Sequence, residues 1–156
     1  GFPDFDPPAE ILDALAREPL WRHLINYRCG TGHSVSFVGN VHEGPHSLNG
    51  RNQVVFVPGM IITDEPGVYE GGQVGIRIEN ELECYQKEVN QYGTFLAFEP
   101  VTFVPIDTSP IVPGVLSGEQ IDWLNHYHRQ VFEKLAPRLT EEERDWLAKK
   151  CAAIGC

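Results

Sequence analysis

This sequence has little positive charge, little cysteine and no long apolar run. Lysine and arginine together number 12 against 22 aspartates and glutamates, which gives a net charge of −10. A surface of this sign repels phosphate backbones and anionic lipids, so neither nucleic acid nor a membrane surface is expected as a partner. No apolar stretch is long enough to cross a bilayer, and the opening residues GFPDFDPPAE lack the pattern of a signal peptide.

The cysteines are too few and too scattered to form a disulfide framework. Cys29, Cys84, Cys151 and Cys156 show no CxxC spacing. Cys151 and Cys156 could pair near the C-terminus, but this density is typical of free thiols in a reducing compartment. We therefore predict free cysteines and a cytoplasmic protein.

Hydrophobic residues make up 42% of the 156 positions, enough for one globular domain over residues 1–156. The two ends of the chain carry helical patterns. Residues 6–21, DPPAEILDALAREPLW, place prolines in the permitted first turn and apolar residues at helical spacing as far as Pro19. Later, Ser117 with Gln120 and Thr140 with Glu143 form capping boxes that predict the starts of two helices.

The middle of the chain predicts antiparallel strands. Residues 53–89 alternate β-branched runs with Pro-Gly and Gly-Gly turns, which is typical of a meander. Residues 93–107, GTFLAFEPVTFVPID, add one or two further strands. The order of a helix, several strands and then helices predicts an α+β fold.

Two histidines and two glutamates are of the kinds that a hydrolytic metal site needs. His33 and His42 lie among glycines, Glu65 precedes Pro66-Gly67 at a strand end, and Glu79 follows Arg77 at the spacing that places both on one face of a strand. Each also has a structural explanation, as a loop hydrogen-bonding histidine, a turn glutamate or a surface ion pair. The residues alone leave both interpretations open.

A resemblance adds to this pattern. The segments GTGHSVSFVGNVHEGPHS, PGMIITDEPGVYE and GIRIENELE resemble, in order and spacing, the signature segments of aminopeptidase P, the Xaa-Pro aminopeptidase of the pita-bread metallopeptidase superfamily. The later FLAFEPVTFVPIDTSPI and EQIDWLNHYHRQVFEKL are similar to the C-terminal end of its long, three-domain cytosolic type. The spacing between His33 and His42 favours this branch over prolidase or methionine aminopeptidase.

The resemblance implies a role for each candidate. His33, Glu65 and Glu79 match metal ligands, Glu65 also being the general base and Glu79 a bridge between two metals. His42 matches a histidine that contacts the substrate at the scissile carbonyl. His46 is expected at the rim of the site. Further supporting or substrate-binding positions are Tyr69, Arg77 and Cys29.

The implied reaction removes the first residue of peptides whose second residue is proline. Two divalent ions that share a hydroxide would activate the attacking water. The resemblance implies two Mn²⁺ in the complete enzyme, although Zn²⁺ or Co²⁺ would also suit carboxylate-rich ligation with one imidazole.

The chain departs from the family pattern in ways that predict an incomplete site. The family has two aspartate ligands on an upstream strand pair, which Asp4 and Asp6 do not match, so this chain is expected to bind a single metal or none and to be inactive alone. Cys29 stands where the family has an outer histidine, and Ser34 and Ser36 replace glycines. The upstream segment and the N-terminal domains are expected to be missing.

We therefore predict a curved antiparallel sheet with outer helices, a partial pita-bread fold. The exposed edge of a partial sheet predicts that the missing N-terminal part of the catalytic domain, or a homo-oligomer, covers it. Two alternatives stay open. One is a non-catalytic pita-bread module that binds peptides or proteins, and the other is a prolidase-like dipeptidase.

Overall fold

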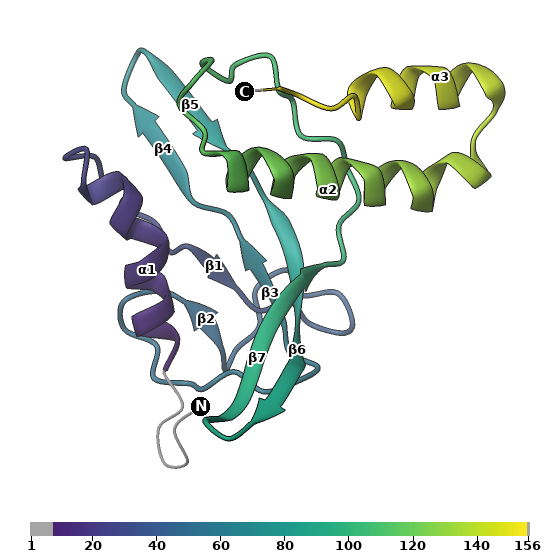
Figure 1. The fold of residues 1–156 in the computed structure, drawn as a ribbon. Coiled ribbons are helices and arrows are strands. Elements are labelled where there is room, and N and C mark those ends of the chain that lie inside the picture. Colours follow the sequence, from purple (N-terminus) through teal and green to yellow (C-terminus); the bar gives the residue numbers. More distant parts are fainter. Residues whose placement is uncertain (1–7, 156) are drawn as a thin grey trace. The chain divides into compact units, whose positions relative to one another are not determined.

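The computed structural model describes residues 8–155 and divides into two compact units (Figure 1). The first unit ends at Thr102 and contains helix α1 and strands β1 to β7, and the second begins at Phe103 and contains helices α2 and α3. Asp4, Asp6 and Cys156 lie outside the described residues. The prediction that residues 1–156 form one domain, continued upstream, stays a prediction.

Helix α1 runs over Ala9–Trp21 and confirms the predicted first helix, but its buried face differs from the apolar stripe. Pro8 is the N-cap, and the helix continues through Pro19. The buried positions are Ala9 and Asp13, whereas Leu15 is 65% exposed. A charged side chain therefore faces the interior of the first unit, where it needs a partner.

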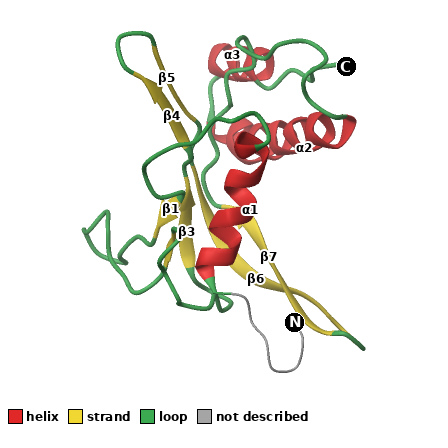
Figure 2. Cartoon of the chain, turned by 90° about the vertical axis from the view of Figure 1, so that its left-hand side faces the viewer, coloured by secondary structure: helices red, strands yellow, loops and turns green. Residues whose placement is uncertain are grey.

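The strands pair antiparallel, as predicted, but not as a simple meander. Strand β3 pairs with β6, and β6 pairs with β7, while β4 and β5 form a separate hairpin (Figure 2). Strand β1 pairs with β2 (Figure 1). The bounds are β1 Gly32–His33, β2 Ser47–Leu48, β3 Ile61–Asp64, β4 Gly67–Glu70, β5 Val74–Arg77, β6 Asn80–Asn90 and β7 Gly93–Pro100.

The core of the first unit joins α1 to the strands. Its buried apolar residues are Ala9, Leu48, Phe56, Ile62 and Cys84. The isolated bridge between Ser34 and Ile62 connects the strand of His33 to β3. Strand β3 is consequently held from both sides, by β6 and by the segment after β1.

The second unit consists of α2 at Gly118–Leu135, the short 3₁₀ helix η1 at Ala136–Arg138 and α3 at Glu141–Lys150. Both predicted capping boxes are present, at Ser117 with Gln120 and at Thr140 with Glu143. The buried residues of α2 are Ile121, Leu124, Tyr127, His128 and Val131.

Three of the predicted free cysteines, Cys29, Cys84 and Cys151, are free thiols. Within residues 8–155, the helices are all too short or too polar to serve as a membrane span.

Candidate metal centre

His33 and Glu65 meet at one point of the first unit. His33 ends β1, and Glu65 is the first residue after β3, as the Pro-Gly that follows it predicted. Atom Nε2 of His33 lies 2.8 Å from Oε1 of Glu65, and both side chains are mostly buried. The fold thus brings together two of the three predicted metal ligands.

The contact of the other ring nitrogen of His33, Nδ1, indicates whether Nε2 carries a proton. Atom Nδ1 lies 3.1 Å from the carbonyl oxygen of Ser34. A carbonyl only accepts, so Nδ1 carries the proton of this hydrogen bond. In the neutral ring, Nε2 then presents a lone pair to the oxygen of Glu65, and two acceptors this close need a shared cation or proton.

This arrangement fits a divalent ion. Two ligands at right angles around one ion, each with a bond of about 2.1 Å, lie about 3 Å apart. A metal-binding histidine also usually donates the N–H of its other ring nitrogen to a carbonyl or carboxylate, as Nδ1 of His33 does to Ser34. His33 and Glu65 therefore have the chemistry and the separation of a ligand pair.

Arg77, the last residue of β5, contacts both Glu65 and Cys29. Atom Nη1 lies 3.6 Å from Oε2 of Glu65, Nε donates to the Glu65 carbonyl at 3.1 Å, and Nη2 donates to Sγ of Cys29 at 3.4 Å. The guanidinium also lies over the ring of Tyr69, 5.4 Å from its centroid. Desolvation opposes the charge, but the hydrogen bond to Cys29 and nearby negative groups raise the pKa of Arg77, so it remains a cation beside the carboxylate.

The other predicted histidines have different surroundings. The ring of His42 packs 3.9 Å from the ring of His33, and His42 itself is exposed. His46 directs Nε2 to the carbonyl of Ile61 at 2.7 Å and sets its ring edge against Phe56, which places it beside the core. His42 is thus an exposed neighbour of His33, whereas His46 packs between the backbone of β3 and the ring of Phe56.

The spacing of Arg77 and Glu79 predicted that both lie on one strand, but Glu79 lies outside it. Strand β5 ends at Arg77 and β6 begins at Asn80, so Glu79 lies in the link between them and is exposed. Among residues 8–155, no group of three or more histidine, cysteine, aspartate or glutamate side chains could hold a metal ion. The described residues therefore form part of a centre, and the role of Glu79 stays a prediction.

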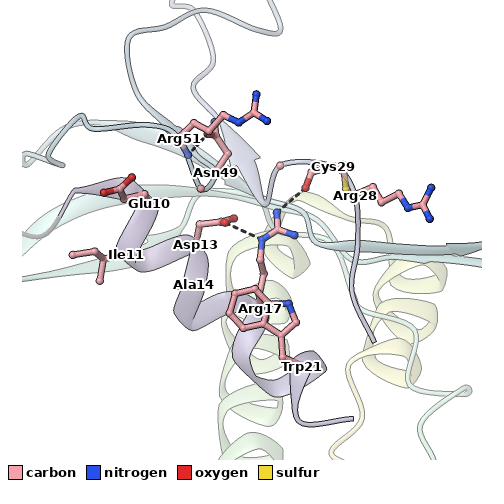
Figure 3. A pocket seen from close by; sticks show the side chains of 12 residues that line it. Glu10, Ile11, Asp13, Ala14, Arg17, Trp21, Arg28, Cys29, Asn49 and Arg51 are labelled. Carbon is pink, nitrogen blue, oxygen red and sulfur yellow. Dashed lines mark hydrogen bonds and ion pairs between the residues drawn. The ribbon is translucent and has the colours of Figure 1, made fainter. Parts of the chain in front are cut away.

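A buried network behind the site fixes the segment that leads to His33. Arg17 of α1 donates to Oδ2 of Asp13 at 2.8 Å and to the carbonyl of Cys29 at 2.7 Å (Figure 3). It also donates to the carbonyl of Tyr27 at 2.7 Å. The hydroxyl of Thr31 donates to the other oxygen of Asp13 and accepts from that of Tyr27. Asp13 thus satisfies both carboxylate oxygens inside the unit.

This network is connected to His33 and Glu65 through the backbone. The carbonyl of Thr31 accepts from the amide of Glu65 at 2.7 Å, and the hydroxyl of Thr63 lies between His33 and Glu65. Asp13, Arg17 and Thr63 were not predicted from the sequence. Signals for them exist, since Asp13 and Arg17 have the i,i+4 spacing of a helical ion pair and Thr63 stands two residues before Glu65.

A cavity of about 1030 Å³ lies on the α1 side of this network (Figure 3). It shares Cys29 with the predicted site, while the remaining predicted site residues are not among those that line it. Its charged lining residues are Glu10, Asp13, Arg17, Arg28 and Arg51.

Two family models match the chain in succession. Residues 7–85 match metallopeptidase family M24, and residues 94–154 match the C-terminal region of peptidase M24. The first match contains all of the predicted ligands. The second covers β7 and the helices of the second unit.

Named relatives agree with these models. Aminopeptidase P2 of Arabidopsis thaliana is 44% identical over 146 residues, 90% of this chain and 21% of the relative. A probable Xaa-Pro aminopeptidase P of Talaromyces marneffei is 43% identical over 147 residues, 89% of this chain and 22% of that protein. The chain therefore spans about a fifth of the length of the curated relatives it matches.

A solved structure confirms the fold class. The X-prolyl aminopeptidase of Caenorhabditis elegans, described as a cytosolic enzyme with a di-nuclear active site, matches with a TM-score of 0.86 and 37% identity. The match covers 96% of this chain and 25% of that one. The chain has the α+β architecture of the corresponding part of this pita-bread enzyme.

Proposed function

Because this chain belongs to metallopeptidase family M24, we propose that it is the C-terminal part of the catalytic domain of a Xaa-Pro aminopeptidase. The complete enzyme would remove the N-terminal residue from peptides that carry proline at the second position. The contact between His33 and Glu65, with Nε2 2.8 Å from Oε1, is the observation that carries this proposal.

The metal would be held by His33 and Glu65 in this chain, by Glu79 if the link between β5 and β6 brings it to them, and by further residues upstream. A pair of divalent ions, when bound, supplies Lewis acidity and lowers the pKa of a shared water. Mn²⁺ is the proposed metal, and Zn²⁺ or Co²⁺ would suit the same donors. With only part of the donor set, this chain alone is expected to hold one ion or none.

The residues of this chain would perform the proton transfer and hold the substrate. Glu65 would accept the proton of the attacking water, because its carboxylate is mostly buried and oriented by neighbouring donors. His42, exposed beside the ring of His33, would donate a hydrogen bond to the oxyanion that forms at the scissile carbonyl. Arg77 would hold the carboxylate of Glu65 in place.

Selectivity for proline would depend on the second residue of the substrate, which contributes the nitrogen of the scissile bond. Proline lacks the amide hydrogen and has a fixed φ, so a site that accepts it needs no acceptor for that hydrogen. The assay therefore compares the complete protein on a Xaa-Pro peptide and on its Xaa-Ala counterpart. Cleavage of the first after its first residue, with far slower cleavage of the second, is expected. Equal cleavage of both, or none, would rule the proposal out.

One observation favours the alternative of a non-catalytic module that binds peptides or proteins. Among the described residues, no three histidine, cysteine, aspartate or glutamate side chains are grouped so that they could hold a metal ion. The same assay decides between the two. A complete protein that binds Xaa-Pro peptides without hydrolysing them, with or without added Mn²⁺, would be a binding module.

We also propose that the protein is cytoplasmic and forms a homo-oligomer. The first rests on the free thiols and on the cytosolic C. elegans relative. The second rests on exposed apolar side chains, among them Phe37, Trp123 and Trp146. Light scattering of the complete protein measures the oligomeric state directly.

A further inference from the structure

We propose that Thr63 is a positioning residue that sets both members of the His33–Glu65 pair through one hydroxyl. Atom Oγ1 of Thr63 accepts from the backbone amide of His33 at 2.9 Å and donates to Oε1 of Glu65 at 2.9 Å. Its kinetic consequence rests on the proposed function, but its effect on metal binding does not.

The bonding capacity of the hydroxyl is well matched to this position. A threonine hydroxyl has one proton and two lone pairs. The proton is directed to Glu65, and a lone pair takes the amide of His33. Since Thr63 is 2% exposed, water does not compete effectively for either contact.

Close backbone packing fixes the hydroxyl where it can reach both residues. A Cβ on Gly32 would lie 1.7 Å from the carbonyl oxygen of Thr63, so only glycine permits this approach of the two strands. On its other side, Thr63 pairs with Glu81 of β6. The amide of Glu65 is held by the carbonyl of Thr31. The Thr63 side chain therefore has little freedom to move away from the pair.

The oxygen of Glu65 that Thr63 contacts is the same one that faces His33. Thr63 donates to Oε1 and thereby restricts rotation of the Glu65 carboxylate, while Arg77 lies on the side of Oε2. Loss of the donor would free the carboxylate to rotate, and loss of the acceptor would leave the amide of His33 unpaired. Both changes would misplace the two ligands with respect to one shared ion.

Two substitutions separate the hydroxyl from the shape of the side chain. Thr63→Val keeps the branched shape and removes the hydroxyl, whereas Thr63→Ser keeps the hydroxyl and removes a methyl group. Thr102→Val is the control, because the hydroxyl of Thr102 accepts the backbone amide of Glu81 at 2.9 Å, on the β6 residue that pairs with Thr63. It therefore reports the general effect of losing such a bond.

The experiment measures Mn²⁺ affinity by calorimetry and steady-state kinetics on a Xaa-Pro peptide, for the complete protein and its three variants. We expect Thr63→Val to weaken Mn²⁺ binding by about 10- to 100-fold and, at saturating Mn²⁺, to lower kcat more than it raises KM. Thr63→Ser should restore most of both, and Thr102→Val should leave the Mn²⁺ affinity unchanged.

Two results would overturn the proposal. One is a Thr63→Ser variant as impaired as Thr63→Val, which would assign the effect to packing of the methyl group. The other is a Thr63→Val variant with the Mn²⁺ affinity of Thr102→Val. If the unmodified protein binds Mn²⁺ but cleaves no Xaa-Pro peptide, while Thr63→Val still weakens that binding, the proposed function fails and the role of Thr63 stands.

Discussion

Atom Nε2 of His33 lies 2.8 Å from Oε1 of Glu65, with its ring turned so that Nδ1 faces the carbonyl of Ser34. His33 belongs to β1 and Glu65 directly follows β3, and these two strands are not paired with each other in the described sheets. Their contact depends on groups between and behind them, which makes the site sensitive to changes outside the ligands.

Glu65→Gln in the complete enzyme should remove the base without changing the shape of the side chain. At saturating Mn²⁺ we expect kcat to fall by about 10²- to 10⁴-fold with little change in KM, because the amide can neither accept the proton nor bind the metal as the carboxylate does. Steady-state kinetics on a Xaa-Pro peptide measure this. Glu70→Gln, on an exposed residue of β4, is the control. A Glu65→Gln enzyme with the original kcat would show that another group is the base.

Gly32→Ala should disrupt the first unit. The added Cβ would lie 1.7 Å from the carbonyl oxygen of Thr63, which is backbone and can move only with β3. We expect a loss of more than about 3 kcal/mol in the free energy of unfolding, as for severe overpacking. Urea unfolding of this chain measures it.

The control for that variant is Gly71→Ala, at a turn where a Cβ would meet no atom within 4 Å. It should change the free energy of unfolding by less than about 0.5 kcal/mol. If both variants were equally stable, the close packing of β1 against β3 would be disproved.

Arg17→Ala tests the network behind the site. The side chains of Arg17 and Asp13 are 12% and 4% exposed, and removal of the cation leaves the buried carboxylate, among the described residues, with the hydroxyl of Thr31. Breaking a buried pair in this way costs about 3–5 kcal/mol of stability. Chemical denaturation of the chain gives the difference directly.

Helix α1 supplies its own control for this prediction. Arg22 and Glu18 form a second i,i+4 ion pair, but their side chains are 75% and 44% exposed. Arg22→Ala should therefore cost less than about 1 kcal/mol. Similar losses in Arg17→Ala and Arg22→Ala would mean that the network contributes no more than a surface pair.

The second unit should lose stability in acid because of His128. Its side chain is fully buried and its Nε2 accepts from the amide of Ile106, and burial lowers the pKa of His128 although that hydrogen bond opposes the shift. The unfolded chain then binds a proton below its ordinary pKa, about 6.5, while the folded chain resists it, so stability is complete above that pH and falls as the pH drops through it.

The measurement uses tryptophan fluorescence during urea unfolding between about pH 8 and about pH 5. In a Trp21→Phe background the remaining tryptophans, Trp123 and Trp146, report on the second unit. His128→Gln should reduce the pH dependence of the unfolding midpoint, and His126→Gln, on an exposed residue, should not. An unchanged slope in His128→Gln would show that His128 does not titrate on unfolding.

Local patterns predicted the features whose causes are local. The two capping boxes are present because each satisfies its own amide groups within one helical turn. Glu65 follows directly after β3 because Pro66 has no amide hydrogen with which to continue the ladder. Glu79 was misplaced since alternation alone does not show where a strand ends, and β5 stops at Arg77.

The sequence by itself determined the family, the element types, the helix caps and the identity of the groups able to bind a cation. Only the tertiary structure decided which of those groups meet. It joined His33 to Glu65 through Thr63 and buried Asp13 with Arg17, because β3 pairs with a distant strand and packs against the glycine of β1. Such contacts depend on strand order and backbone separation, which residue spacing along the chain does not encode.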